Sequence, residues 1–198
     1  TLRLCGQEEP ARETGRISVL ESICCLDRKA ADLGYGYTAT FFNDSPRFEY
    51  RRPDGYVDVR SGVVCTPDND ASTAPDEEGS MRVSVLANHG RFAALPPEEY
   101  ADRKLAESDR ALASAARFVP DVRPHTVFRD VFTPLTIERF TGHVGGAIYG
   151  SPRKLRDGDT GVPGLHVIGN DQGMIGIVGA MLSGVTTANR CATVPQAS

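Results

Sequence analysis

Residues 164–190 constrain the fold of this 198-residue chain more than any other stretch. The short apolar run at 165–168 predicts a buried strand, because it is brief and follows a proline-glycine turn. A glycine-rich turn at 169–173 comes next, and residues 174–189 then have the composition of a helix. The order strand, glycine turn, helix predicts a pair of elements that belongs to a larger sheet than this chain can build alone.

The predicted helix carries an unusual number of small residues along one side. A glycine inside a helix costs about 1 kcal/mol relative to alanine, so repeated glycines indicate that another group approaches the backbone closely. The free N–H groups at the start of the helix favour an anion or a polarised carbonyl, and Asp171 suits a ligand with hydroxyl groups. A buried helix that only packs against a sheet would explain the same pattern. The small residues are Gly176, Gly179, Ala180, Ser183, Gly184 and Ala188.

The motifs GNDQG at 169–173 and GIVGA at 176–180 carry a resemblance to a known family. Residues 165–190 resemble the C-terminal flavin-contacting segment of the phytoene desaturase superfamily, most closely its carotenoid isomerase and retinol saturase-like members. The block from Phe132 to Gly150 resembles the segment that precedes it in that family. Shorter segments, at 35–43, 57–65 and 117–124, are similar to parts of the family's substrate domain.

The resemblance implies an FAD-dependent oxidoreductase that moves a hydride between the flavin N5 and a polyene or similar apolar substrate. Such an enzyme desaturates, saturates or isomerises an isoprenoid-like molecule, and its cofactor carries the difficult chemistry. The turn is expected beside the ribityl chain or diphosphate, and the helix start beside the N1–O2 edge of the flavin. No side chain stands out as a catalytic acid or base. The expected FAD-binding residues are Gly169, Asn170, Asp171, Gly176, Ile177 and Val178.

One feature of that family is absent from the sequence. The family begins with a G-x-G-x-x-G loop for the adenine diphosphate half of FAD, and Gly142, Gly145 and Gly146 do not have its spacing. The chain is therefore expected to be the C-terminal part of a flavoprotein, with an N-terminal FAD-binding half or subunit as its partner. The alternative is a non-catalytic fragment or interaction module that has lost the nucleotide-binding half.

The pattern along the chain predicts an α+β fold, with an antiparallel substrate-domain sheet and a long helix before the C-terminal strand-helix pair. We expect residues 1–132 to form the substrate-binding domain and residues 133–198 the C-terminal FAD-contacting segment. A second helix is expected to begin at Pro134 with Thr133 as its N-cap. The strands are predicted at 17–26, 37–42, 57–65, 81–86 and 122–132, and the long helix at 96–118.

Charge and composition narrow the classes of function. The net charge is −4 with no basic run, which argues against nucleic-acid binding. No apolar run approaches the roughly 20 residues that span a bilayer, and the carboxylates and histidines lack metal-ligand spacing. The five cysteines form no C-x-x-C pair and are read as reduced thiols of a cytoplasmic protein. The expected location is the cytoplasm, and peripheral association with a membrane is compatible with it.

Overall fold

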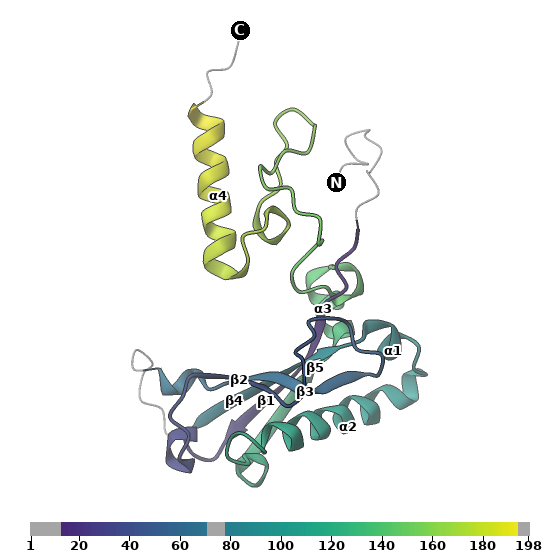
Figure 1. The fold of residues 1–198 in the computed structure, drawn as a ribbon, viewed down its shortest axis with the longest axis vertical. Coiled ribbons are helices and arrows are strands. Elements are labelled where there is room, and N and C mark those ends of the chain that lie inside the picture. The colour runs from purple at the N-terminus through teal and green to yellow at the C-terminus, as the bar shows by residue number, and fades with distance from the viewer. Residues whose placement is uncertain (1–12, 71–77, 194–198) are drawn as a thin grey trace. The chain divides into compact units, whose positions relative to one another are not determined.

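The computed structural model describes residues 13–70 and 78–193 of the chain. These residues fall into two compact units, shown in Figure 1. The first unit is Arg16–Gly146, and the second contains residues 13–15 and 147–193.

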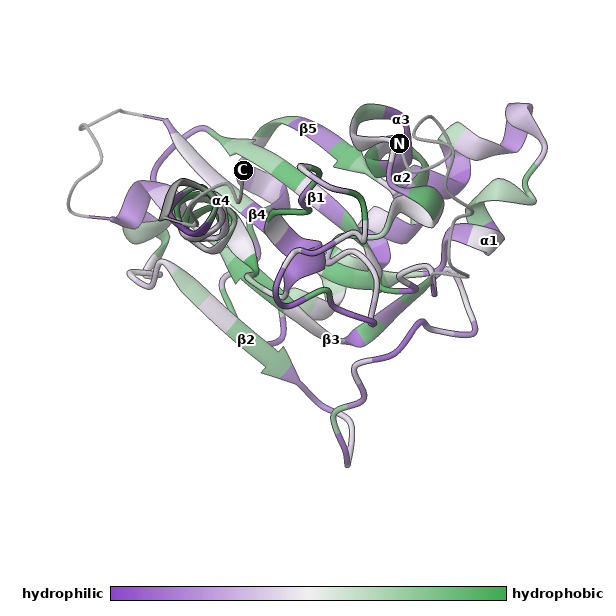
Figure 2. Ribbon diagram, turned by 90° about the horizontal axis from the view of Figure 1, so that it is seen from above, coloured by the Kyte–Doolittle hydropathy of each residue, from purple (hydrophilic) through white to green (hydrophobic). Residues whose placement is uncertain are grey.

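A five-stranded antiparallel sheet forms the centre of the first unit, with the strand order β2-β3-β4-β1-β5. Figure 2 shows β2 and β5 at opposite edges of it. The predicted α+β class, with an antiparallel sheet and a long helix, is thereby confirmed, and all five predicted strands are present. The strands are β1 (Ser18–Leu26), β2 (Ala39–Asn43), β3 (Val57–Cys65), β4 (Gly79–Ala87) and β5 (Thr126–Phe132).

Helix α2 (Pro97–Ala115) covers one face of this sheet. Residues of a strand alternate between the two faces, and in β1 the even-numbered residues are the buried ones. The hydroxyl groups of Ser22 in β1 and Ser108 in α2 lie 2.8 Å apart, so the even-numbered face is the one that contacts the helix. The core lies between this face and α2, and it includes Leu20, Cys24, Val64, Val83, Val85, Ala111 and Leu112.

The buried thiol of Cys24 belongs to this core, and its burial raises its pKa above the ordinary value. A thiol with a raised pKa is protonated and unreactive at neutral pH. Cys25 follows it on β1 but lies on the opposite face of the sheet and is only half-buried.

Helix α3 (Pro134–Thr141) begins where the sequence predicts it. Thr133 and Thr136 form a reciprocal capping box, and Gly142 ends the helix in the left-handed conformation with φ 70°. The short helix α1 (His89–Ala93) was not predicted, because five residues are too few to show a periodic pattern. The cap of α1 is the Asn88 side chain, which accepts a hydrogen bond from the Arg91 N–H.

Glu138 of α3 joins two neighbouring elements. Its carboxylate accepts a hydrogen bond from the Gly145 N–H at 2.9 Å and lies 2.6 Å from His89 Nε2 in α1. The backbone hydrogen bond from Gly145, followed by the bond to His89, lowers the pKa of Glu138 below its ordinary value. The charged form of Glu138 is therefore favoured in the folded protein.

This linkage predicts a loss of stability in acid. Because the pKa is lower in the folded state, stability from Glu138 is fully present above its unfolded pKa of about 4.5 and is lost as the pH falls through the folded value. In urea unfolding between pH 6 and roughly pH 3, we expect Glu138→Gln to lose less stability than the parent. Identical pH dependence in the two proteins would contradict the assignment.

The second unit contains helix α4 (Gly176–Thr193) and a preceding 3₁₀ turn, Gly169–Gln172. The predicted helix at 174–189 is confirmed with shifted ends, but the predicted strand at 165–168 is wrong for this chain. Its backbone forms one isolated bridge, between Asp159 and His166. A strand needs neighbours along its length, and the residues that the structure describes offer only this one pairing here. Further 3₁₀ turns in the chain are Ala30–Leu33, Pro67–Asn69, Arg123–His125 and Val144–Gly146.

Among the described residues, no helix combines the length and apolar character needed to cross a membrane.

Candidate functional site

The start of α4 is shaped by two glycines in the left-handed region. Gly173 has φ 97° and Gly176 has φ 80°, a conformation that side chains with a Cβ rarely adopt. A Cβ added at Gly176 would meet no atom within 4 Å. Ile177 and Val178 follow at 83% and 70% exposure. The first turn of α4 therefore presents backbone N–H groups, which lack an intrahelical partner, at an open surface.

The 3₁₀ turn Gly169–Gln172 packs against the small-residue side of α4. The Ser183 hydroxyl accepts a hydrogen bond from the Gly169 N–H at 2.6 Å and donates one to the Ala180 carbonyl at 2.7 Å. One turn further along, Gln172 Nε2 donates to the Thr187 hydroxyl at 3.1 Å. Ser183 and Thr187 are both buried. The small residues of α4 thus receive the turn that precedes the helix, which is part of their structural role.

Asp171 is held by the segment before the turn. Its Oδ1 accepts a hydrogen bond from the Ser151 N–H at 2.8 Å, and its carbonyl accepts one from the Leu155 N–H at 2.8 Å. The neighbouring Asn170 carbonyl accepts a hydrogen bond from Lys154 Nζ, also at 2.8 Å. Asp171 therefore has a structural task that the sequence did not reveal, and one of its carboxylate oxygens is committed to that task.

Two buried acceptors in the same turn have no partner among the described residues. These atoms are Asn170 Oδ1 and Gln172 Oε1, and His166 Nδ1 is likewise unpartnered. A buried polar atom without a hydrogen bond costs about 1–3 kcal/mol, so such atoms are sites for a donor from a water molecule or a ligand. The turn thus offers acceptors for a group that carries hydroxyl or N–H donors. Gln172 was missed as a candidate although it lies inside the GNDQG motif.

The opposite side of α4 is apolar and exposed. In a helix of a folded domain the apolar side normally faces inward, but here the buried side is small and polar. An exposed apolar surface of this kind marks an interaction site. Its members are Ile177, Val178, Met181, Leu182 and Val185, each more than half exposed.

The second candidate surface lies on the first unit, on the sheet face opposite α2, and is called the open face here. The strand register aligns one row of side chains across all five strands, because each residue of the row is paired with the residue of the row on the neighbouring strand. This row is Phe41, Val63, Ser84, Glu21 and Phe132, from β2 to β5. Ser84 donates a hydrogen bond to Glu21 at 3.1 Å, which satisfies the polar middle of the row.

Aromatic residues frame both edges of the open face. Phe41 on β2 is 81% exposed, and Phe128 on β5 is 63% exposed. Half-buried Ile23 and Cys25 lie between these edges on β1. The face is mixed in character, because exposed Arg82 and Asp130 lie on either side of Ile23 in the register. Its apolar positions can receive a flat or elongated apolar molecule, or another protein surface. Strand alternation in the sequence indicates these residues, but only the register shows that they share a face.

Comparison with known proteins gives one informative similarity and no matching family model. The chloroplast prolycopene isomerase of Arabidopsis thaliana is 28% identical to this chain over 135 residues. The alignment covers 62% of this chain and 22% of that protein, so the chain spans only a small part of the length of its curated relative. The similarity suggests a carotenoid isomerase or desaturase-like family and nothing finer.

Proposed function

We propose that this chain supplies the substrate domain and the C-terminal flavin-contacting segment of an FAD-dependent oxidoreductase that acts on a polyene or similar isoprenoid. The observation that carries this proposal is the similarity to prolycopene isomerase. The open face of the sheet supports it, because exposed phenylalanines at both edges suit a long apolar substrate. An N-terminal FAD-binding half or subunit completes the enzyme.

The residues of the 3₁₀ turn and α4 fit an FAD molecule by the chemistry they present. Asn170 Oδ1 and Gln172 Oε1 are buried acceptors that could take the hydroxyl groups of a ribityl chain. The backbone N–H groups of Gly176, Ile177 and Val178 are donors for the N1–O2 edge of the ring. FAD, when bound, supplies the hydride chemistry. The role of this chain is then to hold the ring and to orient the substrate against it.

The chain alone is expected to bind FAD weakly. The diphosphate cradle of the family is absent from this sequence, and each charge-assisted hydrogen bond to a phosphate contributes about 1.5–3 kcal/mol. The loss of two such bonds weakens affinity by more than about a hundredfold. Gel filtration of the chain with FAD should therefore give a colourless protein. A yellow protein that keeps its FAD without a second chain would contradict this expectation.

The proposed function is tested with the dinucleotide-binding half. Reading the coding sequence upstream of Thr1, and the adjacent genes, should reveal a G-x-G-x-x-G segment. We expect the chain and that segment, purified together, to retain FAD and to change the isomer composition or saturation of prolycopene, as followed by chromatography. A stable complex that holds no FAD and leaves prolycopene unchanged would refute the proposal.

The exposed apolar side of α4 also favours a second candidate, a non-catalytic interaction module. Its residues could serve a partner protein without any cofactor, because apolar surface alone can drive association. Measuring partner binding with and without FAD distinguishes the two candidate functions. A module would bind its partner at full strength in the absence of FAD, whereas the flavoprotein part would associate more tightly when FAD is present.

A further inference from the structure

A cavity lined by arginines lies in the first unit. Its volume is about 540 Å³, which is within the usual range for small-molecule sites. It is formed where the loop between β2 and β3 meets α1 and the residues just before β1. The cavity is lined by Arg16, Arg51, Arg52, Asp54, Asn88 and Arg91.

The loop is held in place by bonds that leave some of these cations available. Asn88 Nδ2 donates to the Pro53 carbonyl at 2.8 Å, and Arg91 Nε donates to the Asp54 carbonyl at 3.0 Å. These two bonds hold the loop and the Arg91 guanidinium in place relative to each other. The second bond uses only the Nε of Arg91 and does not involve the two terminal nitrogens of its guanidinium. A guanidinium held in this way loses little freedom when an anion binds it.

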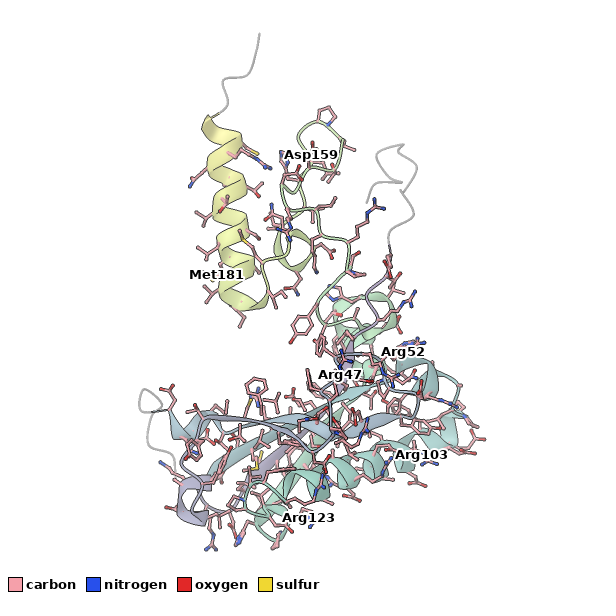
Figure 3. The ribbon with its side chains drawn as sticks, in the orientation of Figure 1. Arg47, Arg52, Arg103, Arg123, Asp159 and Met181 are labelled. Atoms are coloured by element: carbon pink, nitrogen blue, oxygen red, sulfur yellow. The ribbon has the colours of Figure 1, made fainter. Side chains whose placement is uncertain are left out.

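The charges in the cavity do not balance. Arg51 pairs with Glu49 at 2.5 Å and lies 3.7 Å from a carboxylate oxygen of Asp54, so its charge is neutralised. Arg52 and Arg91 form no ion pair with any carboxylate in the described part of the chain. The overall charge of the protein is −4, so a positive cavity runs against the average of the molecule. Figure 3 shows Arg47 and Arg52 on the same loop.

We propose that this cavity binds a phosphate group. The planar guanidinium fork matches the oxygens of a phosphate and can form two parallel hydrogen bonds to it. The cavity is larger than one phosphate, so it leaves room for the group that bears the phosphate. That group can be a small dissolved phosphate compound or the headgroup of an anionic lipid. Phe48 and Tyr50, exposed on the same loop with rings 6.3 Å apart, suit either a flat ligand or a lipid headgroup region.

The first measurement is titration of the purified chain with inorganic pyrophosphate at low ionic strength, by calorimetry. We expect saturable binding that weakens as salt is added, and at least tenfold weaker binding for Arg52→Gln/Arg91→Gln. The Arg52→Lys/Arg91→Lys pair keeps the charge without the fork and should fall between them. Arg153→Gln/Arg156→Gln removes two exposed arginines of the second unit and serves as the charge-matched control.

The second measurement separates the two sources of phosphate. The same variants are sedimented with vesicles of phosphatidylcholine, with and without phosphatidylglycerol. Binding to the anionic vesicles that pyrophosphate displaces assigns the site to a lipid headgroup. Pyrophosphate binding without vesicle binding assigns it to a dissolved phosphate compound. If neither probe binds, or if the Arg52 and Arg91 variants bind as the parent does while unfolding normally, the proposal fails.

Discussion

Gly146→Ala is expected to destabilise the first unit by about 2–5 kcal/mol, a large part of the stability of a typical domain. Two costs add at this position. Gly146 has φ 62°, where a residue with a Cβ is strained by about 1–2 kcal/mol. The added Cβ would also overlap the carbonyl oxygen of Pro134 and lie 2.9 Å from its carbonyl carbon. Relief would require α3 to move away from this turn, and crowding of that kind costs about 1–3 kcal/mol.

The neighbouring glycine provides the control. Gly145 has nearly the same φ, 68°, but a Cβ added there meets no atom within 4 Å. Gly145→Ala should therefore cost only the backbone strain, about 1–2 kcal/mol, and it keeps the N–H that bonds to Glu138. Urea unfolding of both variants measures the difference. Equal losses would show that the approach of Pro134 does not limit this turn.

In the reconstituted flavoprotein, Gly176→Val is expected to weaken FAD binding by about tenfold to a hundredfold and to slow flavin reduction by a similar or larger factor. The backbone of Gly176 has φ 80°, which a β-branched residue adopts only under strain. The first turn of α4 would rearrange to relieve that strain, and the N–H donors proposed for the flavin edge would move with it. Displacements of about 1 Å near reacting atoms can cost on the order of a hundredfold in rate.

Gly161→Val separates this effect from general destabilisation. Gly161 has φ 76° and, like Gly176, no atom within 4 Å of an added Cβ, but it lies outside the turn and the helix start. The FAD dissociation constant and single-turnover flavin reduction are measured for both variants. If Gly176→Val behaves as Gly161→Val does in both measurements, the start of α4 supports a helix and does not contact a flavin.

The five-stranded sheet shows what the alternation of apolar and polar residues predicts and what it does not. It predicts where the strands lie, but not which residues share the open face. Residues 57–65 were predicted as a strand with the bounds that β3 has, and the other four strands were placed with errors only at their ends. Alternation of apolar and polar residues reports burial on one face, which is a local property. The alignment of Phe41 with Phe132 across five strands depends on strand order and register, which are properties of distant pairs.

Helix caps followed the sequence closely because they are set by a few adjacent residues. Thr133 caps α3 as predicted, and the glycines that end or begin helices occupy the left-handed conformation that their type permits. The arginine-lined cavity could not be predicted in this way. Its members come from residues 16, 51–54 and 88–91, and nothing in the spacing of these segments reveals that they meet.

The C-terminal stretch shows both outcomes in one place. Its sequence determined a helix with a small-residue side, a glycine turn and a resemblance to carotenoid isomerases, because these depend on local composition and order. The tertiary structure decided that residues 165–168 form only a single bridge, since a strand exists only where neighbours supply its hydrogen bonds. It also decided that Asp171 bonds to Ser151, that Ser183 receives the Gly169 N–H, and that the apolar side of α4 is exposed. Contacts between residues distant in sequence settle these points, and no local pattern contains them.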